Sequence, residues 1–164
     1  MRLREMAPFL SLTVLFFLLC GCGIRPLAGV EPIERQLVVT GYCRCDECCG
    51  WHRGLGGWPV YSSGPNKGKR KIIGITASGT RAWHGTIAAD TTRYPFGTVM
   101  YVDGYGYGQV EDEGEDIKGD RIDIYFNSHS QALLWGKKTM TVSIWLPPIT
   151  PDAVSEDHSP HEDE

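Results

Sequence analysis

The amino-acid sequence predicts a mainly β domain, folded as a small barrel with one short helix. Three observations favour this class. Short segments rich in β-branched and aromatic residues follow one another, turn-forming Gly and Pro separate them, and a single segment has a helical pattern. With 164 residues, 41% of them hydrophobic and 22% charged, the chain is long enough for one domain and apolar enough to bury a core.

Six segments have the composition of strands. In chain order they are residues 36–42, 86–89, 98–103, 108–112, 122–126 and 139–146. Turn sequences at 94–97 and 104–108 separate three of them. Residues 128–135 form the predicted helix, because Ala132, Leu133 and Trp135 give it an apolar side. The stretch 50–71 is rich in Gly and Pro and is predicted to be a loop.

The N-terminal residues 1–21 have the anatomy of a bacterial lipoprotein signal. Arg2 and Arg4 precede an apolar run over 7–19, which is too short for a comfortable membrane span. The run ends in Leu-Cys-Gly-Cys, which resembles the lipobox that directs cleavage just before a lipid-carrying cysteine. We therefore expect Cys22 to be the lipidated first residue of the mature protein, with an ordinary signal peptide as the alternative.

This signal predicts a protein of the bacterial cell envelope that is exported and anchored to a membrane by lipid, at the outer membrane or the periplasmic face in a Gram-negative cell. Residues 22–35 are then a tether and 36–146 the folded domain. The tail, 147–164, holds six acidic residues, several Pro and no Lys or Arg, so it is predicted to be disordered. The tail sets the net charge of -4, and without a basic excess nucleic acid is not an expected partner.

Four cysteines crowd into seven residues after the first predicted strand: Cys43, Cys45, Cys48 and Cys49. An oxidising compartment favours disulfides, and an even number of thiols fits them. A bond between the adjacent Cys48 and Cys49 would be strained, because neighbouring Cα atoms are only ~3.8 Å apart. A crossed and a nested pairing stay open, and a four-thiolate zinc site is the rival. The sequence favours disulfides and predicts no metal or other cofactor.

Three aspartates stand at informative strand positions. Period two in residues 121–126 puts Asp123 on the face opposite Ile122 and Ile124, and aspartate is a poor strand former, so its presence needs a reason. Asp112 ends one predicted strand and Asp90 follows another. We expect the three carboxylates to converge at one mouth of the barrel as a catalytic site. The alternatives are turn capping, a local ion pair or a Ca²⁺ site.

An ordered series of segments resembles the three-aspartate (3D) domain, shared by membrane-bound lytic transglycosylase A and by muralytic stationary-phase survival proteins of Gram-positive bacteria. The similarity covers residues 86–135, with Thr40-Gly41-Tyr42 resembling the first strand of that domain. The segments are Ala89-Asp90, Tyr94-Pro95-Phe96-Gly97-Thr98, Glu111-Asp112-Glu113-Gly114, Ile117-Lys118-Gly119 and Arg121-Ile122-Asp123-Ile124-Tyr125-Phe126. The intervals between the aspartates, 22 and 11 residues, also agree with that family.

This resemblance implies a six-stranded double-psi β-barrel and an enzyme, a peptidoglycan lytic transglycosylase. Such an enzyme cleaves the MurNAc–GlcNAc β-1,4 bond of the glycan strand and leaves a 1,6-anhydro product. Asp123 corresponds to the family's proposed single general acid/base, Asp112 to a second residue of the same site, and Asp90 to the first aspartate. Four further residues are expected to contact sugar: Tyr42, Tyr101, Lys118 and His129.

The match to the family pattern is not complete. The loop after Asp112 carries Glu113, Glu115 and Asp116, where the family usually has glycines and a small residue. Two other functions therefore stay open. One is a non-catalytic glycan-binding module, and the other is a structural envelope lipoprotein stabilised by Ca²⁺ or zinc.

Overall fold

The computed structural model describes residues 23–148. The predicted signal, the lipidation site Cys22 and residues 149–164 of the predicted tail lie outside the described residues. In the part of the chain that the structure describes, no helix combines the length and apolar character needed to span a membrane.

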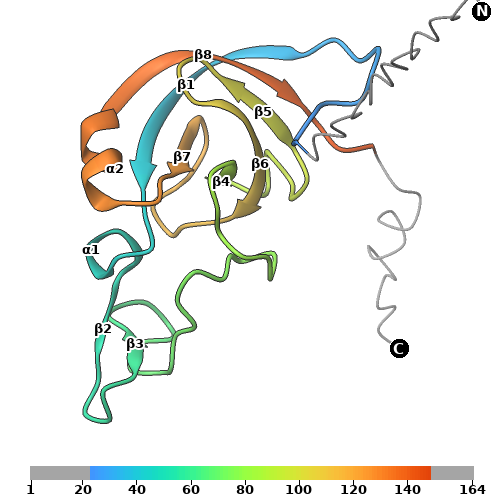
Figure 1. Ribbon diagram of the computed structural model, residues 1–164. Coiled ribbons are helices and arrows are strands. Elements are labelled where there is room, and N and C mark those ends of the chain that lie inside the picture. The colour runs from blue at the N-terminus through green and yellow to red at the C-terminus, as the bar shows by residue number, and fades with distance from the viewer. Residues whose placement is uncertain (1–22, 149–164) are drawn as a thin grey trace, which may run out of the picture.

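Six strands close into a barrel, so the mainly β prediction is confirmed (Figure 1). They are β1 (Ile33–Tyr42), β4 (Thr86–Ala89), β5 (Val99–Val102), β6 (Gly106–Asp112), β7 (Arg121–Tyr125) and β8 (Lys137–Trp145). Their order around the barrel is β1-β7-β4-β6-β5-β8. β1 pairs with β7 and β4 with β6 in parallel, and the other four pairs are antiparallel. These two parallel pairs within one closed sheet match the expected double-psi arrangement.

Alternation along the strands builds the core, as the sequence pattern predicts. One side chain in two points into the barrel, where it is removed from water. The fully buried members of this core include Leu37, Val39, Ile87, Val110, Ile122, Ile124 and Val142. Each buried aliphatic side chain of this size contributes about 1.5 to 3 kcal/mol, and closure leaves no open sheet edge.

The first strand is longer than the sequence predicts. β1 begins at Ile33, and Ile33, Glu34 and Arg35 pair with Ile144, Ser143 and Val142 of β8. The end of the predicted tether, 22–35, therefore belongs to the barrel.

Two small elements between β1 and β4 were not predicted. The cysteine loop contains a one-turn helix, α1 (Asp46–Cys49), and a two-stranded hairpin follows, β2 (Trp51–Arg53) and β3 (Pro59–Tyr61). The hairpin projects away from the barrel (Figure 1). Three-residue strands carry too little alternation to stand out in a segment rich in Gly and Pro.

The predicted helix is present as α2 (His129–Trp135). Ser128 caps it, because its side-chain oxygen accepts a hydrogen bond from the backbone N–H of Gln131 at 3.3 Å. α2 packs against β1 at Gly41, where an added Cβ would lie 2.9 Å from the carbonyl oxygen of Ala132. Glycine at this position therefore allows helix and strand to approach closely.

Candidate functional site

Two of the three predicted aspartates lie in one row across the barrel wall. Asp112 of β6 and Asp123 of β7 both stand in register with Ala88 of β4, which lies between them, and Thr40 of β1 stands beside Asp123. We call Thr40, Asp123, Ala88 and Asp112 the aspartate row. With one strand between them, the two aspartate Cα atoms lie about 10 Å apart.

The aspartate row faces the outside of the barrel. Ile87, the residue before Ala88, belongs to the interior core, whereas Ala88 packs in a second cluster with Tyr42, Ile117 and Tyr125. Successive side chains of a strand point to opposite faces, so the row looks outward from the wall. The expected convergence at a barrel mouth is thus replaced by a site on the outer surface.

A β-bulge selects Asp112 for this row. Ile87 pairs with Val110, but the next residue, Ala88, pairs with Asp112, so Glu111 is the extra residue of β6. The Glu111 carboxylate instead accepts a hydrogen bond from the Thr86 hydroxyl at 2.6 Å. Without the bulge, Glu111 would stand opposite Ala88.

One carboxylate oxygen of Asp123 is held and the other is free. Oδ1 accepts a hydrogen bond from the Thr40 hydroxyl and lies 3.6 Å from Nε of Arg121. Within residues 23–148, Oδ2 of Asp123 accepts no hydrogen bond. The side chain is 15% exposed. Asp123 is therefore oriented through one oxygen and has a second oxygen available to exchange a proton with a ligand.

Both oxygens of Asp112 are occupied. Oδ1 accepts hydrogen bonds from the backbone N–H groups of Ala77 and Glu113, each at 3.0 Å, and Oδ2 accepts one from the Tyr42 hydroxyl at 3.2 Å. Burial raises the pKa of Asp112 above its ordinary value, and these hydrogen bonds oppose the effect only in part. Asp112 is fixed in place rather than free to react.

The variant Asp112→Asn tests whether burial outweighs the hydrogen bonds in setting the pKa of Asp112, through the pH dependence of stability. The pKa of Asp112 is raised on folding, so the folded protein favours the protonated carboxyl. The contribution of Asp112 to the free energy of unfolding is therefore fully present below the ordinary aspartate pKa and is lost as pH rises through the pKa of the folded state. We expect the wild-type advantage in free energy of unfolding over Asp112→Asn to be largest in acid and to decline with pH. Urea unfolding at a series of pH values measures it, and an advantage that grows with pH would contradict the burial argument.

Tyr42, predicted to contact sugar, is buried at the end of β1 and holds Asp112. Burial, and then the charge of Asp112, raise the pKa of Tyr42 well above its ordinary value, so its hydroxyl stays protonated and donates. Its ring packs edge-to-face on Tyr125, with centroids 5.4 Å apart. These contacts are those of a residue that positions Asp112.

Asp90 makes a different set of contacts. Its Oδ1 accepts hydrogen bonds from the hydroxyl and backbone N–H of Thr92 at 2.7 and 3.2 Å, and its Oδ2 accepts one from the backbone N–H of Gly119 at 2.8 Å. The Gly119 bond, followed by the Thr92 hydroxyl, lowers the pKa of Asp90. Within the described chain, Asp90 therefore joins its own turn to the loop before β7 and makes no hydrogen bond to Asp112 or Asp123.

Asp90→Asn is expected to have the opposite pH signature. Because the pKa of Asp90 is lowered on folding, its ionised carboxylate stabilises the fold at pH values above the pKa of the unfolded chain. This stabilisation is lost as pH falls through the pKa of the folded state. The wild type should exceed the variant most near neutral pH, and the two should converge in acid. The same urea series measures this, and a gap that widens on acidification would overturn the assignment.

In the described chain, the other three residues predicted to contact sugar make no hydrogen bond or ion pair with Asp112 or Asp123. Tyr101 is exposed on β5, beside Tyr107 with ring centroids 5.0 Å apart, and Lys118 is exposed in the loop that Asp90 holds. His129, at the start of α2, lies among the cysteines, so its contacts give no support to a sugar-binding role.

Two contributors to the site were missed by sequence reasoning. Thr40 orients Asp123, and the backbone of Ala77 holds Asp112. Ala77 lies in the turn Thr76-Ala77-Ser78-Gly79-Thr80, where the backbone N–H of Ser78 also donates to the carbonyl of Glu111 at 2.9 Å. The Ser, Thr and Gly content signals a turn, but no local signal indicates where that turn docks.

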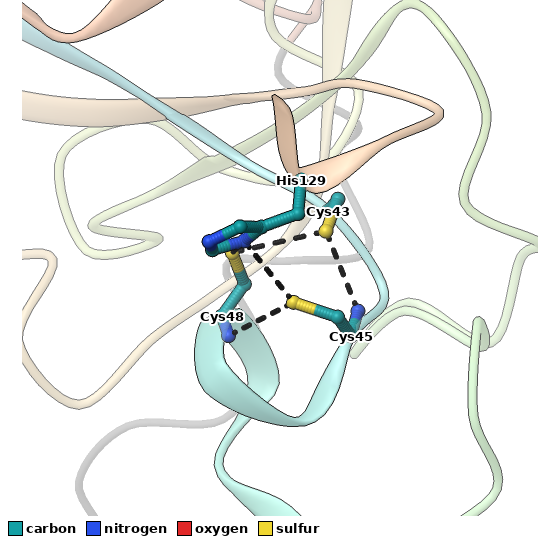
Figure 2. Close-up of side chains that lie close together, drawn as sticks. All are labelled: Cys43, Cys45, Cys48 and His129. Atoms are coloured by element: carbon teal, nitrogen blue, oxygen red, sulfur yellow. Dashed lines mark hydrogen bonds between the residues drawn. The ribbon is translucent and has the colours of Figure 1, made fainter. Parts of the chain in front are cut away.

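All four cysteines of the loop are free, so the expected disulfides are not formed. The sulfurs of Cys43 and Cys48 are 3.8 Å apart, whereas a disulfide holds its sulfurs about 2.05 Å apart. Cys43, Cys45 and Cys48 gather around His129 (Figure 2). Cys49 lies outside this group, because its thiol donates to the carbonyl of Cys43 at 3.1 Å.

Comparison with known proteins finds similarity over part of this chain. Residues 85–146 match the family model described as the 3D domain. A 58-residue stretch is 43% identical to Bacillus subtilis (strain 168) YabE, whose name describes it provisionally as a cell wall shaping protein, and it covers 35% of this chain and 14% of YabE. A 77-residue stretch is 39% identical to the cell wall-binding protein YocH of the same organism, covering 44% of this chain and 27% of YocH.

A solved structure is also similar, the crystal structure of MltA from E. coli. The similarity has a TM-score of 0.36 and 22% sequence identity, and it covers 43% of this chain and 26% of MltA. The chain therefore spans less than a third of each of these three proteins.

Proposed function

We propose that the protein acts on the glycan strands of peptidoglycan as a lytic transglycosylase, because residues 85–146 match the family model described as the 3D domain. The two Bacillus relatives are named for cell wall shaping and cell wall binding, which supports peptidoglycan as the partner. The observation that carries the proposal of catalysis is the aspartate row. In this row Asp123 has one carboxylate oxygen without a hydrogen bond, whereas Asp112, on the far side of Ala88, accepts hydrogen bonds at both oxygens.

A single reactive carboxyl group suits this reaction. Ordinary glycosidases need a second carboxylate to activate water or to attack the sugar. A lytic transglycosylase instead uses the C6 hydroxyl of MurNAc, which the sugar ring itself holds near C1. The donors on both oxygens of Asp112 make it a poor second base, so the transglycosylase route fits the row better than hydrolysis.

Asp123 would serve twice in one cycle. As the acid it gives its proton to the oxygen of the glycosidic bond, and the C1–O bond to the GlcNAc leaving group breaks. The Asp123 carboxylate then accepts the proton of the C6 hydroxyl as O6 bonds to C1. The products are a 1,6-anhydro-MurNAc end and a free GlcNAc hydroxyl, and Asp123 is protonated again.

The neighbouring residues would position this carboxyl. Thr40 and Arg121 contact Oδ1 of Asp123, and Oδ2, which has no hydrogen bond in the described chain, would meet the ligand. Tyr42 holds Asp112, whose carboxylate would favour positive charge developing on the sugar ring in the transition state. Tyr101 and Lys118, both exposed, are proposed to contact more distant sugars.

The location proposed for the protein is the bacterial cell envelope. Its support is the cell-wall naming of both relatives together with the signal-like residues 1–21. Lipid anchoring through Cys22 is part of the same proposal and rests on the sequence alone.

Product analysis tests the function. The purified protein is incubated with peptidoglycan, and the released muropeptides are analysed by mass spectrometry. We expect 1,6-anhydro ends. Reducing ends would identify a hydrolase, and retention on the polymer without release would identify a binding module.

Non-catalytic binding is the second candidate, because YocH is named a cell wall-binding protein. A group of three aromatic side chains suits this function, since Tyr107 lies between Tyr101 and Trp145 with ring centroids 5.0 and 6.0 Å away. The two tyrosines are exposed and Trp145 is half-buried. Aromatic faces stack on sugar rings and need no acid to do so.

A further inference from the structure

Three cysteines and one histidine outside the aspartate row form a compact group (Figure 2). Cys43 follows β1, Cys45 and Cys48 lie at the start and within the turn of α1, and His129 opens α2. Their four ligand atoms, three Sγ and one ring nitrogen, all lie within 4.8 Å of one another. The group thus joins two segments that are more than eighty residues apart in sequence.

The distances match a tetrahedral metal centre. With Zn–S bonds of about 2.3 Å and Zn–N bonds of about 2.0 to 2.1 Å, tetrahedral angles place two sulfurs about 3.8 Å apart and a sulfur and a nitrogen about 3.6 Å apart. The Cys43 and Cys48 sulfurs are 3.8 Å apart, and those of Cys45 and Cys48 each lie 3.4 Å from Nδ1 of His129. Sulfurs joined by a disulfide would be much closer.

The surroundings are those of a metal site as well. A metal-binding histidine usually gives the proton of its other ring nitrogen to a carboxylate, which fixes its orientation. Here Nε2 of His129 lies 2.9 Å from a carboxylate oxygen of Glu47. Two sulfurs also receive backbone N–H bonds, Cys43 from Cys45 at 3.5 Å and Cys45 from Cys48 at 3.4 Å. Such donors stabilise negative charge on a thiolate.

We propose that Cys43, Cys45, Cys48 and His129 bind one Zn²⁺ ion. Three thiolates and one imidazole are a structural zinc set, and four protein ligands leave no position for water or substrate. The role is therefore structural. The ion ties the cysteine loop to α2, directly after Tyr42, which holds Asp112. Cys49 is not a ligand.

Metal analysis of the full chain tests the proposal. We expect one zinc per chain after purification without chelator, and the visible absorption of tetrahedral thiolate-bound cobalt when Co²⁺ replaces zinc. Cys45→Ser should lose most of the bound metal, whereas the matched control Cys49→Ser should keep one equivalent. His129→Ala should also lose the metal, and His129→Cys should retain it by supplying a fourth thiolate.

Three outcomes would overturn the proposal. One is a folded wild-type chain that holds no zinc after reduction and incubation with Zn²⁺. A second is equal metal loss in Cys49→Ser and Cys45→Ser, and a third is full retention in His129→Ala. If a variant fails to fold, the Co²⁺ spectrum of the wild type still decides. Metal content is read without any assay of glycan cleavage, so it is independent of the proposed function.

Discussion

Replacing Asp123 with asparagine is expected to abolish the release of anhydro-muropeptides while leaving the protein folded. The asparagine oxygen still accepts the hydrogen bond of Thr40, so the row keeps its geometry. The amide has no acidic proton to give to the glycosidic oxygen, and it is too weak a base to accept one from the C6 hydroxyl. General acid/base groups typically contribute about 10² to 10⁴ in rate, and we expect a loss of that size.

The matched control for this experiment is Asp103→Asn. Asp103 is an exposed aspartate in the turn between β5 and β6, and its side chain makes no hydrogen bond or ion pair within the described part of the chain. The control should keep wild-type activity, and both variants should show the wild-type urea midpoint. A folded Asp123→Asn protein that releases anhydro-muropeptides at the wild-type rate would refute the role given to Asp123.

Ile124→Ala is expected to destabilise the barrel by about 2 to 5 kcal/mol. Ile124 is fully buried and pairs in register with Gly41 of β1 and Ile87 of β4, so three strands meet at its side chain. Truncation leaves a cavity that these strands, closed in a ring, cannot easily fill. Urea unfolding should show a lower midpoint with an unchanged slope.

Ile72→Ala removes the same atoms from the surface and is the matched control. Ile72 is 70% exposed in the segment before β4, and its truncation should change the free energy of unfolding by no more than about 0.5 kcal/mol. Similar losses in the two variants would contradict the placement of Ile124 in the barrel core.

The strands and the helix were predictable because their signals are local. Ile122, Asp123 and Ile124 alternate between the interior and the outer wall as period two requires, and Ser128 caps α2 where the pattern begins. These features depend on neighbours a few residues away. The barrel class followed from them and is confirmed.

The composition of the site was less predictable, because it depends on register and on contacts between distant segments. Asp112 enters the row through a bulge at Glu111, and no pattern within β6 shows which of these two acids stands opposite Ala88. The sequence gives no sign that Asp90 differs from Asp112 and Asp123, yet its carboxylate accepts a hydrogen bond from the backbone N–H of Gly119 instead of joining the row. His129 lies eighty or more residues from its cysteine neighbours, so the cysteine spacing alone favoured disulfides.

The central claim is that Asp123 catalyses attack of the MurNAc C6 hydroxyl on C1 of the same sugar, so that no water molecule enters the product. Digestion of peptidoglycan in water labelled with heavy oxygen, followed by mass spectrometry of the new ends, tests it most directly. The account predicts 1,6-anhydro-MurNAc ends that carry no label, since O6 of the sugar forms the new bond. Reducing MurNAc ends that carry one labelled oxygen would show attack by water and would contradict it, as would glycan binding with no cleavage at all.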